Sequence, residues 1–301
     1  MPPQRSIRIT EVGPRDGLQN EAIAVSTDAK VAFVNLLSST GVAEIEVSSF
    51  VSAKWIPQLG DAAEVLRRID RRKGVTYSAL VPNEKGLDAA LEARVDKIAV
   101  FTAASETFSR KNTNASLAES LERFKPVIAR AKVTASLPVR AYISCAVACP
   151  YEGPIDPKKV RDLAAKLLDL GADEIDLGDT IGVAVPTDID VLYEAIDGLL
   201  APSQTTLHLH DTRGTALACA CRAVEIGVTS FDSSCGGIGG CPYAPGAMGN
   251  IATEELVYTL NKMGFHTGVD LQRMFEAGRH ISAAMDRTLP GRLFKADGWR
   301  G

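Results

Sequence analysis

The sequence predicts a (β/α)8 barrel, in which eight parallel strands close into a ring and each strand is followed by a helix. Three observations lead to this prediction. Short β-rich runs alternate with helical patterns along the whole chain, eight strand–helix units can be distinguished, and no low-complexity spacer separates them. The 301 residues suffice for one large α/β domain, and no linker interrupts them, so we expect a single domain over residues 1–301. A doubly wound open sheet is the alternative, because a strand count from one sequence can be wrong.

The first half of the chain supplies four strand–helix units. The strands are apolar and β-branched runs bounded by turn residues, and the helices show apolar residues at helical spacing. Thr27 is a candidate N-cap for the first helix, and Gly41 follows the end of that helix. In chain order we expect strand 7–12, helix 27–40, strand 43–48, helix 58–72, strand 76–80, helix 84–93, strand 97–102 and helix 117–133.

The second half repeats the pattern. Asp156 and Pro157 open one of its helices, with proline at a favoured first position, and Gly171 stops that helix. A glycine-rich loop at 235–249 follows the eighth strand and precedes helices at 251–263 and 270–285, so extra helices end the chain. Before that loop we expect strand 139–145, helix 156–170, strand 174–177, helix 187–200, a strand within 204–212, helix 213–226 and strand 229–233.

Two histidines stand two residues apart in the seventh predicted strand. Alternate residues of a strand face the same way, so His208 and His210 should point together while Leu207 and Leu209 pack on the other side. Two neutral imidazoles side by side suit a divalent metal. The alternative is a strand end with two hydrogen-bonded histidines. A metal would need further ligands from elsewhere in the chain.

The active face of a (β/α)8 barrel lies at the carboxyl ends of its strands, which makes the polar residues there candidates for function. After the first strand, Arg15 and Asp16 are flanked by Gly13, Pro14 and Gly17 in a tight turn. Asp16 offers the oxygen ligand that the histidines lack. Arg15 offers a fixed positive fork for a carboxylate or a developing enolate oxygen. The alternative for the Arg15–Asp16 pair is a surface ion pair of little energetic weight.

Three further strand ends carry candidate residues. Glu46 on the second strand should face into the barrel, where Arg15 is its natural partner. Asp179, after the sixth strand, is either a helper near the substrate or the cap of the next helix. The glycine-rich loop suits a mobile lid, on which Cys241 could act as a general acid or base; a merely accessible thiol is the alternative.

Asn250 follows that loop and can offer a carbonyl oxygen to a metal. Together with Asp16, His208 and His210 it makes a mixed set of oxygen and nitrogen ligands with room for substrate and water. This set suits Mg²⁺ or Mn²⁺, whereas zinc prefers fewer and closer ligands. We therefore expect a divalent metal site formed by Asp16, His208, His210 and Asn250.

Composition narrows the function class. A net charge of −4 argues against a nucleic-acid partner, and no apolar run reaches the roughly 20 residues of a membrane span. The stretch 1–6 lacks the apolar region of a signal peptide, so a cytoplasmic location is expected. Free thiols are expected for the cysteines of such a chain, and Cys219 and Cys221 should not share a helix face.

Five separated segments carry a resemblance to a known family. They are 11–21 (Glu-Val-Gly-Pro-Arg-Asp-Gly-Leu-Gln-Asn-Glu), 149–153 (Cys-Pro-Tyr-Glu-Gly), 177–182 (Leu-Gly-Asp-Thr-Ile-Gly), the histidine pair, and 239–244 (Gly-Gly-Cys-Pro-Tyr-Ala). In this order they resemble the 3-hydroxy-3-methylglutaryl-CoA lyases, and the resemblance extends over about residues 7–285. That family is a metal-dependent (β/α)8 lyase, usually dimeric, which cleaves its thioester to acetyl-CoA and acetoacetate.

The resemblance implies roles for the residues singled out above. It implies Asp16, His208, His210 and Asn250 as metal ligands, Arg15 and Cys241 as catalytic residues, and Glu46 as support for Arg15. It also implies an acyl-CoA substrate and a homodimer. In such a cleavage the C3 hydroxyl loses its proton, which Asp16 or a group bound to the metal would take, and Cys241 would protonate the acetyl carbanion once the lid closes.

The glycine-rich loop departs from the family pattern. The family's usual loop begins Ser-Val-Ala-Gly-Leu, whereas this chain has Cys235, Gly236 and Ile238 in that part, and Met248 stands where a serine is common. Reaction type should survive these changes, but the acyl pocket could suit a related acyl-CoA with a different 3-substituent. A reversible disulfide between Cys235 and Cys241 is a further hypothesis.

Other functions stay open at this point. An acetyl-CoA condensing enzyme of the isopropylmalate or homocitrate synthase type is the nearest alternative, but such chains lack the Gly-Gly-Cys-Pro-Tyr loop. A metal-dependent hydrolase or a catalytically silent metal-binding barrel is less consistent with Arg15, Asp16 and Cys241. No phosphate-binding glycine motif is present, so CoA would be held by scattered basic groups such as Arg110 and Lys111. The pathway, leucine degradation or a terpenoid variant, is not indicated by these residues.

Overall fold

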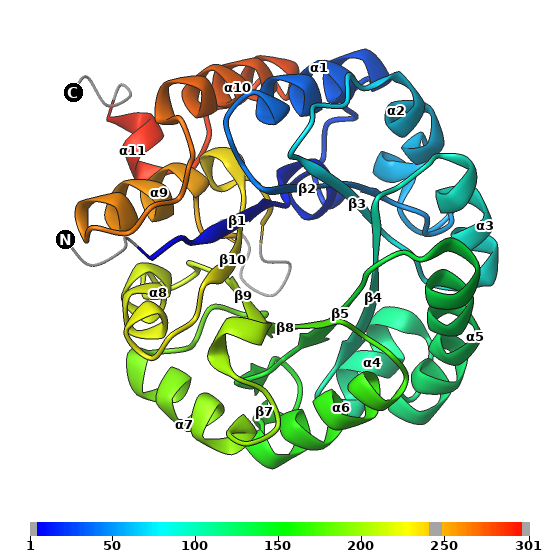
Figure 1. Cartoon of the computed structure of the whole chain (residues 1–301). Helices are drawn as coiled ribbons and strands as arrows, with labels where there is room; N and C mark the ends of the chain where they lie inside the picture. Colours follow the sequence, from blue (N-terminus) through cyan, green and yellow to red (C-terminus); the bar gives the residue numbers. More distant parts are fainter. Residues whose placement is uncertain (1–4, 241–248, 297–301) are drawn as a thin grey trace.

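In the computed structural model, which describes residues 5–240 and 249–296, the predicted closed barrel is present (Figure 1). Eight parallel strands follow one another around it in the order β1-β10-β9-β8-β5-β4-β3-β2. The ring closes where β1 pairs with β10, with Arg8 opposite Ser230. The strands are β1 (Arg8–Glu11), β2 (Glu44–Ser49), β3 (Thr76–Leu80), β4 (Lys97–Ala103), β5 (Val139–Ser144), β8 (Glu174–Asp179), β9 (Thr205–Leu209) and β10 (Ser230–Ser233).

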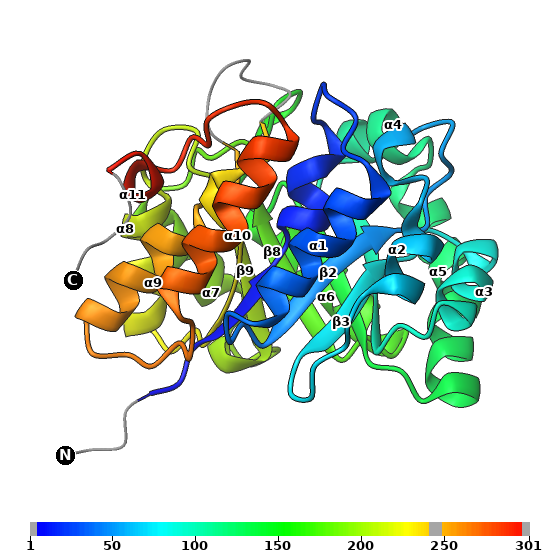
Figure 2. The ribbon, with the colours of Figure 1, turned by 90° about the horizontal axis from the view of Figure 1, so that it is seen from above.

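Helices surround the strands and bury an aliphatic layer between the two shells (Figures 1 and 2). The last long helix, α10 (Leu271–Ala284), lies beside the first, so the two ends of the chain meet on one side of the barrel. The other long helices are α1 (Thr27–Ser38), α2 (Ala62–Arg68), α3 (Glu84–Glu92), α5 (Leu117–Ala135), α6 (Pro157–Asp169), α7 (Pro186–Ile196), α8 (Ala216–Glu225) and α9 (Thr253–Lys262). Within the described residues no helix is long and apolar enough to cross a membrane.

Local structure differs from the prediction at several element ends. The N-cap of α1 is Ser26 and not Thr27, because the Ser26 hydroxyl accepts from the backbone N–H of Ala29. The predicted helix 58–72 is divided into a 3-10 turn at Pro57–Leu59 and the shorter α2. The sequence analysis also missed α4 (Glu106–Thr113), α11 (Arg292–Lys295) and a two-stranded sheet of β6 (Ala148–Cys149) and β7 (Gly153–Pro154).

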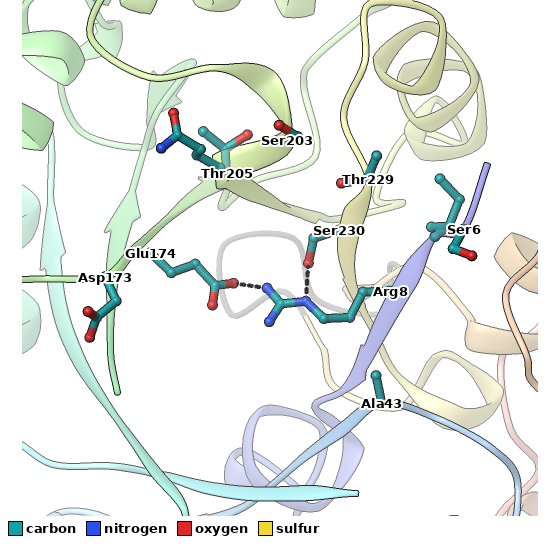
Figure 3. A pocket seen from close by; sticks show the side chains of 11 residues that line it. Ser6, Arg8, Ala43, Asp173, Glu174, Ser203, Thr205, Thr229 and Ser230 are labelled. Atoms are coloured by element: carbon teal, nitrogen blue, oxygen red, sulfur yellow. Dashed lines mark hydrogen bonds and ion pairs between the residues drawn. The ribbon is translucent and has the colours of Figure 1, made fainter. Parts of the chain in front are cut away.

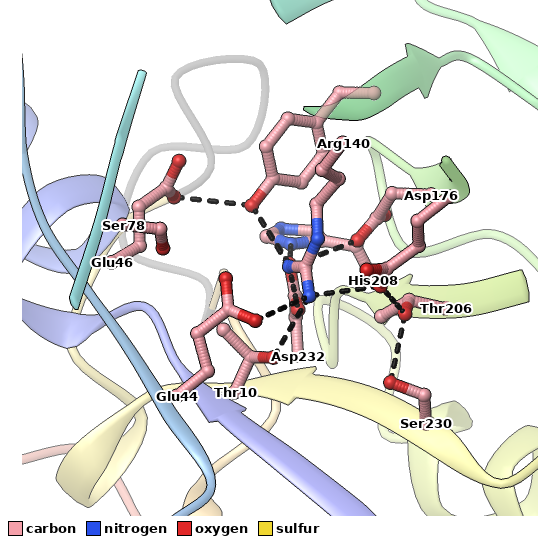
Figure 4. Close-up of polar contacts among 12 residues, drawn as sticks. Thr10, Glu44, Glu46, Ser78, Arg140, Asp176, Thr206, His208, Ser230 and Asp232 are labelled. Carbon is pink, nitrogen blue, oxygen red and sulfur yellow. Dashed lines mark hydrogen bonds and ion pairs between the residues drawn. The ribbon is translucent and has the colours of Figure 1, made fainter. Parts of the chain in front are cut away.

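The barrel interior is polar and tightly connected (Figure 4). Arg140 on β5 reaches across the barrel, where its guanidinium lies 2.8 Å from Asp232, 2.9 Å from Glu174 and 3.4 Å from Glu44. Lys97 on β4 bridges Glu44 at 2.9 Å and Glu174 at 2.5 Å. Charges this deep are stabilised only by mutual pairing, and the pairs therefore fix the strands relative to one another.

The amino end of the barrel is closed by Arg8. Its guanidinium bonds the Glu174 carboxylate and, through Nε at 3.0 Å, the Ser230 hydroxyl, beneath a shallow hollow that opens to solvent (Figure 3). The nitrogens of this guanidinium all face groups inside the barrel. Nη2 also bonds the Thr206 hydroxyl, and Nη1 lies 3.7 Å from Glu44 Oε2. The histidines and the Arg15–Asp16 turn lie at the other end, as the fold predicts for functional groups.

Candidate functional site

The turn after β1 is a single π-helical turn, Gly13–Gly17, rather than a simple tight turn. The backbone N–H groups of Arg15, Asp16 and Gly17 all donate to the carbonyl of Val12. A Cβ on Gly17 would lie 2.6 Å from Ile238, so only glycine allows the turn to approach the loop after β10 this closely. The turn therefore holds Arg15 and Asp16 over the carboxyl end of the barrel.

Arg15 is buried between two carboxylates. Its Nε donates to Glu46 Oε2 at 2.5 Å, and a second nitrogen of the guanidinium pairs with Asp16. The predicted pairing with Glu46 is therefore present. The guanidinium also lies 5.2 Å from the ring centre of Tyr142. Burial alone would lower the pKa of Arg15, but the charges of Glu46 and Asp16 outweigh burial and raise that pKa well above its ordinary value, so the side chain stays cationic.

The two histidines point together, as the strand pattern predicts. His208 Nε2 lies 3.3 Å from His210 Nε2 and 3.8 Å from Asp16 Oδ2, and both rings are buried. Burial and the neighbouring His208 lower the pKa of His210 to about 4, so His210 is neutral near pH 7. The pKa of Asp16 is lowered despite its burial, because Arg15 and the histidines favour the carboxylate. The pKa of His208 is raised, because its hydrogen bond to Asp232 and the charge of Asp16 outweigh burial. Metal binds neutral imidazoles and ionised carboxylates, so binding here would release a proton from His208.

Asn250 completes the predicted set. Its Nδ2 donates to Asp16 Oδ2 at 2.9 Å and to the Ile238 carbonyl at 3.2 Å, and its backbone forms a bridge with His210. Next to that bridge, the Asp211 N–H donates to the Gly249 carbonyl at 2.6 Å. In this arrangement the amide nitrogen, not the amide oxygen, faces Asp16. Metal ligation by Asn250 would require its amide to turn.

A divalent cation fits this place for two reasons. Ligand atoms of Asp16, His208 and His210 lie within 4.8 Å of one another, and His210 Nδ1 is a buried nitrogen without a hydrogen-bond partner in the described structure. Inside the described barrel, acidic side chains also outnumber basic ones. The acids are Asp16, Glu44, Glu46, Glu174, Asp176 and Asp232, and the bases are Arg8, Arg15, Lys97 and Arg140. Burial and the neighbouring Asp232 raise the pKa of Asp176 well above its ordinary value, so the negative excess is smaller than this count, and a positive ion at the histidines would offset what remains.

Asp179 is engaged elsewhere. Both of its oxygens accept from backbone N–H groups in the loop before α7, from Val183 at 3.1 Å and from Ala184 at 2.9 Å. Of the two roles left open by the sequence, these contacts favour a structural one, although the carboxylate holds the loop and does not cap the helix itself. The N-cap position of α7 is Val185.

Cys241 and Met248 lie outside the described residues. Cys235 is fully buried, with its Sγ 3.6 Å from Glu254 Oε1, and burial raises the pKa of this thiol well above its ordinary value. Arg110 pairs with Glu106 on the exposed side of α4, and Lys111 lies 4.0 Å from the ring centre of Tyr151.

The sequence analysis missed three groups beneath the site: Arg140, Tyr142 and Asp232. The Tyr142 hydroxyl lies 3.1 Å from Glu46 Oε2 and 3.2 Å from Asp232 Oδ2, which links the Arg15 side of the site to the His208 side. Alternation along 139–145 and 229–233 could have placed all three inside the barrel. Their mutual contacts depend on the strand order, which no local pattern encodes.

Comparisons with known proteins agree with this geometry. Residues 6–281 match the model of the HMGL-like family. The rat cytoplasmic 3-hydroxy-3-methylglutaryl-CoA lyase is 49% identical over 96% of this chain and 84% of its own length. The crystal structure of the Bacillus subtilis HMG-CoA lyase superposes with a TM-score of 0.96 at 47% identity and covers 99% of both chains.

A solved structure with a lower sequence identity to this chain contains bound ligands. It is an HMG-CoA lyase from an Acinetobacter baumannii source in complex with coenzyme A and 3-methylmalate. This chain is similar to it with a TM-score of 0.92 at 37% identity, over 98% of this chain and 96% of that one.

Proposed function

The chain belongs to the HMGL-like family, and from this premise we propose that it is a carbon–carbon lyase that cleaves 3-hydroxy-3-methylglutaryl-CoA to acetyl-CoA and acetoacetate. The observation that carries the proposal is the convergence of Asp16, His208 and His210 beside the buried Arg15 at the carboxyl end of the barrel. That arrangement places oxygen and imidazole ligands next to a fixed cation.

Asp16, His208, His210 and, after a turn of its amide, Asn250 would hold a divalent metal, for which Mg²⁺ or Mn²⁺ suits the ligand set. When bound, such an ion supplies a Lewis acid that lowers the pKa of the substrate's C3 hydroxyl. Asp16, which lies next to the histidines, or a group bound to the ion would accept the hydroxyl proton.

Arg15 would bind the thioester oxygen on which negative charge develops as the carbon–carbon bond breaks. Its guanidinium is buried, permanently charged and held by Glu46, so it needs no reorganisation during the reaction. Cys241 would deliver the proton to the acetyl carbanion and so complete acetyl-CoA. Residues 1–301 would act as one catalytic domain.

We infer an acyl-CoA substrate, since the Acinetobacter relative is described in complex with coenzyme A. Arg110 and Lys111 on α4 stay candidates for contacts with CoA. Assembly as a homodimer and a cytoplasmic location are part of the proposal; the latter is supported by the name of the rat relative.

The test is acetoacetate release from purified protein given 3-hydroxy-3-methylglutaryl-CoA and Mg²⁺, with and without excess chelator. Release that chelator abolishes and added Mg²⁺ restores is the expected result. Release that is insensitive to chelator would contradict the metal site. If folded, metal-loaded protein releases no acetoacetate, the substrate would instead be an acyl-CoA with a different 3-substituent.

A further inference from the structure

Beneath the histidine pair lies a carboxylate that no role has yet been given. Asp232 on β10 faces His208 on the adjacent strand β9, and the two residues are register partners. Asp232 Oδ2 lies 3.1 Å from His208 Nδ1, and the Asp232 side chain is completely buried. Asp232 contacts Nδ1, whereas Asp16 and His210 lie near Nε2, the other nitrogen of the same ring.

The contact decides which imidazole nitrogen carries hydrogen. Asp232 is the acceptor, because its oxygens already accept from two other donors, the Arg140 guanidinium at 2.8 Å and the Tyr142 hydroxyl at 3.2 Å. Nδ1 of His208 must therefore be the donor. In a neutral ring this leaves the lone pair on Nε2, which is the nitrogen that faces Asp16 and His210.

Asp232 is itself held from several sides. Arg140 bonds its Oδ1, and the Tyr142 hydroxyl lies 3.2 Å from its Oδ2. Arg140 is fixed in turn by Glu174 at 2.9 Å and by the Thr10 hydroxyl at 3.0 Å. A carboxylate with so many partners cannot follow a moving ring, so it restrains the orientation of His208.

We propose that Asp232 is a positioning residue for the metal site: by accepting the Nδ1–H of His208 it fixes the tautomer and the direction of that ring, so that Nε2 is presented to the ion. The inference rests on the proposed role of His208 as a ligand. Removing the outer hydrogen-bond partner of a ligating histidine typically costs 10–100-fold in metal affinity.

Asp176 on β8 provides a matched control. It is as deeply buried as Asp232, and its Oδ2 lies 3.5 Å from the same Arg140 guanidinium. An oxygen of Asp176 lies within 4.8 Å of a ring nitrogen of His208 and of an Asp232 oxygen, but none of the described hydrogen bonds joins Asp176 to His208. Substitution at Asp176 therefore perturbs the same buried cluster without removing the acceptor of His208.

The first measurement uses the unaltered protein without metal. The chain contains four histidines, and nitrogen-15 NMR of labelled rings distinguishes a protonated Nδ1 from a protonated Nε2. The His208 signals can be assigned by their loss in His208→Gln. The spectra are recorded at a pH high enough for the ring to be neutral, and the expected result is protonation at Nδ1 with the lone pair on Nε2. A neutral ring protonated at Nε2 would overturn the proposal, and no variant at Asp232 needs to fold for this test.

The second measurement is Mn²⁺ affinity, followed by electron paramagnetic resonance of the free ion. Asp232→Ala should bind Mn²⁺ about 10–100-fold more weakly than the parent protein, while Asp232→Asn, which keeps an acceptor oxygen, should recover part of the loss. Asp176→Asn should stay within about threefold of the parent.

The outcomes separate this inference from the function on which it rests. Asp232→Ala that is folded and binds Mn²⁺ like the parent overturns the positioning role alone. Equal weakening in Asp232→Ala and Asp176→Asn also overturns it, since the effect would then belong to the buried charge cluster and not to the hydrogen bond. A parent protein that binds no Mn²⁺ overturns the metal site, and this inference with it.

Discussion

Glu46 and Arg15 form a buried ion pair that joins β2 to the turn after β1, with Oε2 of the first and Nε of the second 2.5 Å apart. The pair adds a charged contact between two segments whose strands, β1 and β2, already pair in parallel. The Glu46 carboxylate also accepts a hydrogen bond from the Tyr142 hydroxyl at 3.1 Å. The orientation of Arg15 is therefore set by a network of contacts and not by one contact.

Glu46→Gln should lower turnover and stability together. Without the charge of Glu46, Arg15 keeps only Asp16 as an anionic partner, and a displaced guanidinium can cost on the order of 100-fold in rate. Leaving a buried charge with fewer partners should cost about 3 kcal/mol in the free energy of unfolding. Kinetics and denaturant unfolding measure the two effects. Glu64→Gln breaks an exposed pair with Arg68 and should cost less than about 1 kcal/mol; equal effects of the two variants would contradict the role of Glu46.

Two neighbouring glycines in the loop after β10 should respond differently to alanine. Gly239 has a φ of +102°, and a Cβ there would lie 2.6 Å from the amide nitrogen of Asn250. Among the described residues, a Cβ at Gly240 would meet no heavy atom within 4 Å. Gly239→Ala should therefore displace Asn250 and weaken Mn²⁺ binding, whereas Gly240→Ala should bind the ion like the parent. Calorimetric titration compares the two, and equal affinities would show that Asn250 contributes little to the site.

Cys241→Ala tests the proposed proton donor. The expected result is intact Mn²⁺ affinity with turnover reduced about 100- to 10,000-fold, as for the loss of a general acid. Cys221→Ala removes a half-buried thiol on α8 and should leave turnover unchanged. Near-normal turnover of the Cys241 variant would refute the assignment.

The pH dependence of stability should report on Glu11, a buried carboxyl that accepts from Gly13, Cys235 and Thr253. Burial, which outweighs these hydrogen bonds, raises its pKa from 4.5 to about 8. Between these values the folded state binds more protons than the unfolded state, so this group's contribution to stability falls as pH rises and levels off above about 8.

Glu11→Gln, which resembles the protonated acid, should flatten that slope. Glu254, whose pKa is raised to about 7 mainly by burial, contributes in the same direction at lower pH, so the difference should be clearest between pH 7 and 8. Thermal unfolding of metal-free protein across this range measures it. Glu276→Gln, on an exposed position of α10, should retain the parent slope, and a parent slope in Glu11→Gln would mean that Glu11 is ionised in the folded protein.

Strand periodicity was enough to predict the barrel, the shared direction of His208 and His210, and the pairing of Glu46 with Arg15. These features depend on alternation within a strand and on contact between sequential neighbours. Element ends were less predictable: Ser26 and Thr27 are both good N-caps, and only backbone geometry selects the first. The short α4 was missed because its eight residues carry too little apolar pattern.

The groups beneath the site could not be predicted for a different reason. Asp232 and Arg140 meet across the barrel, 92 residues apart in sequence, and that meeting depends on the order in which the strands close. For Asp179 the location could be predicted, but the contacts of its side chain could not. Its position was predicted, but its partners are backbone groups of a loop whose path no side-chain pattern specifies.

Closure of the barrel between β1 and β10 has a consequence for the synthesis of the protein. Asp16 and Asn250, which contact each other at 2.9 Å, are separated by 234 residues in the chain. Three of the four proposed ligands, His208, His210 and Asn250, come from the last third of the sequence. The proposed metal site would therefore be complete only after Asn250 has been synthesised and the barrel has closed.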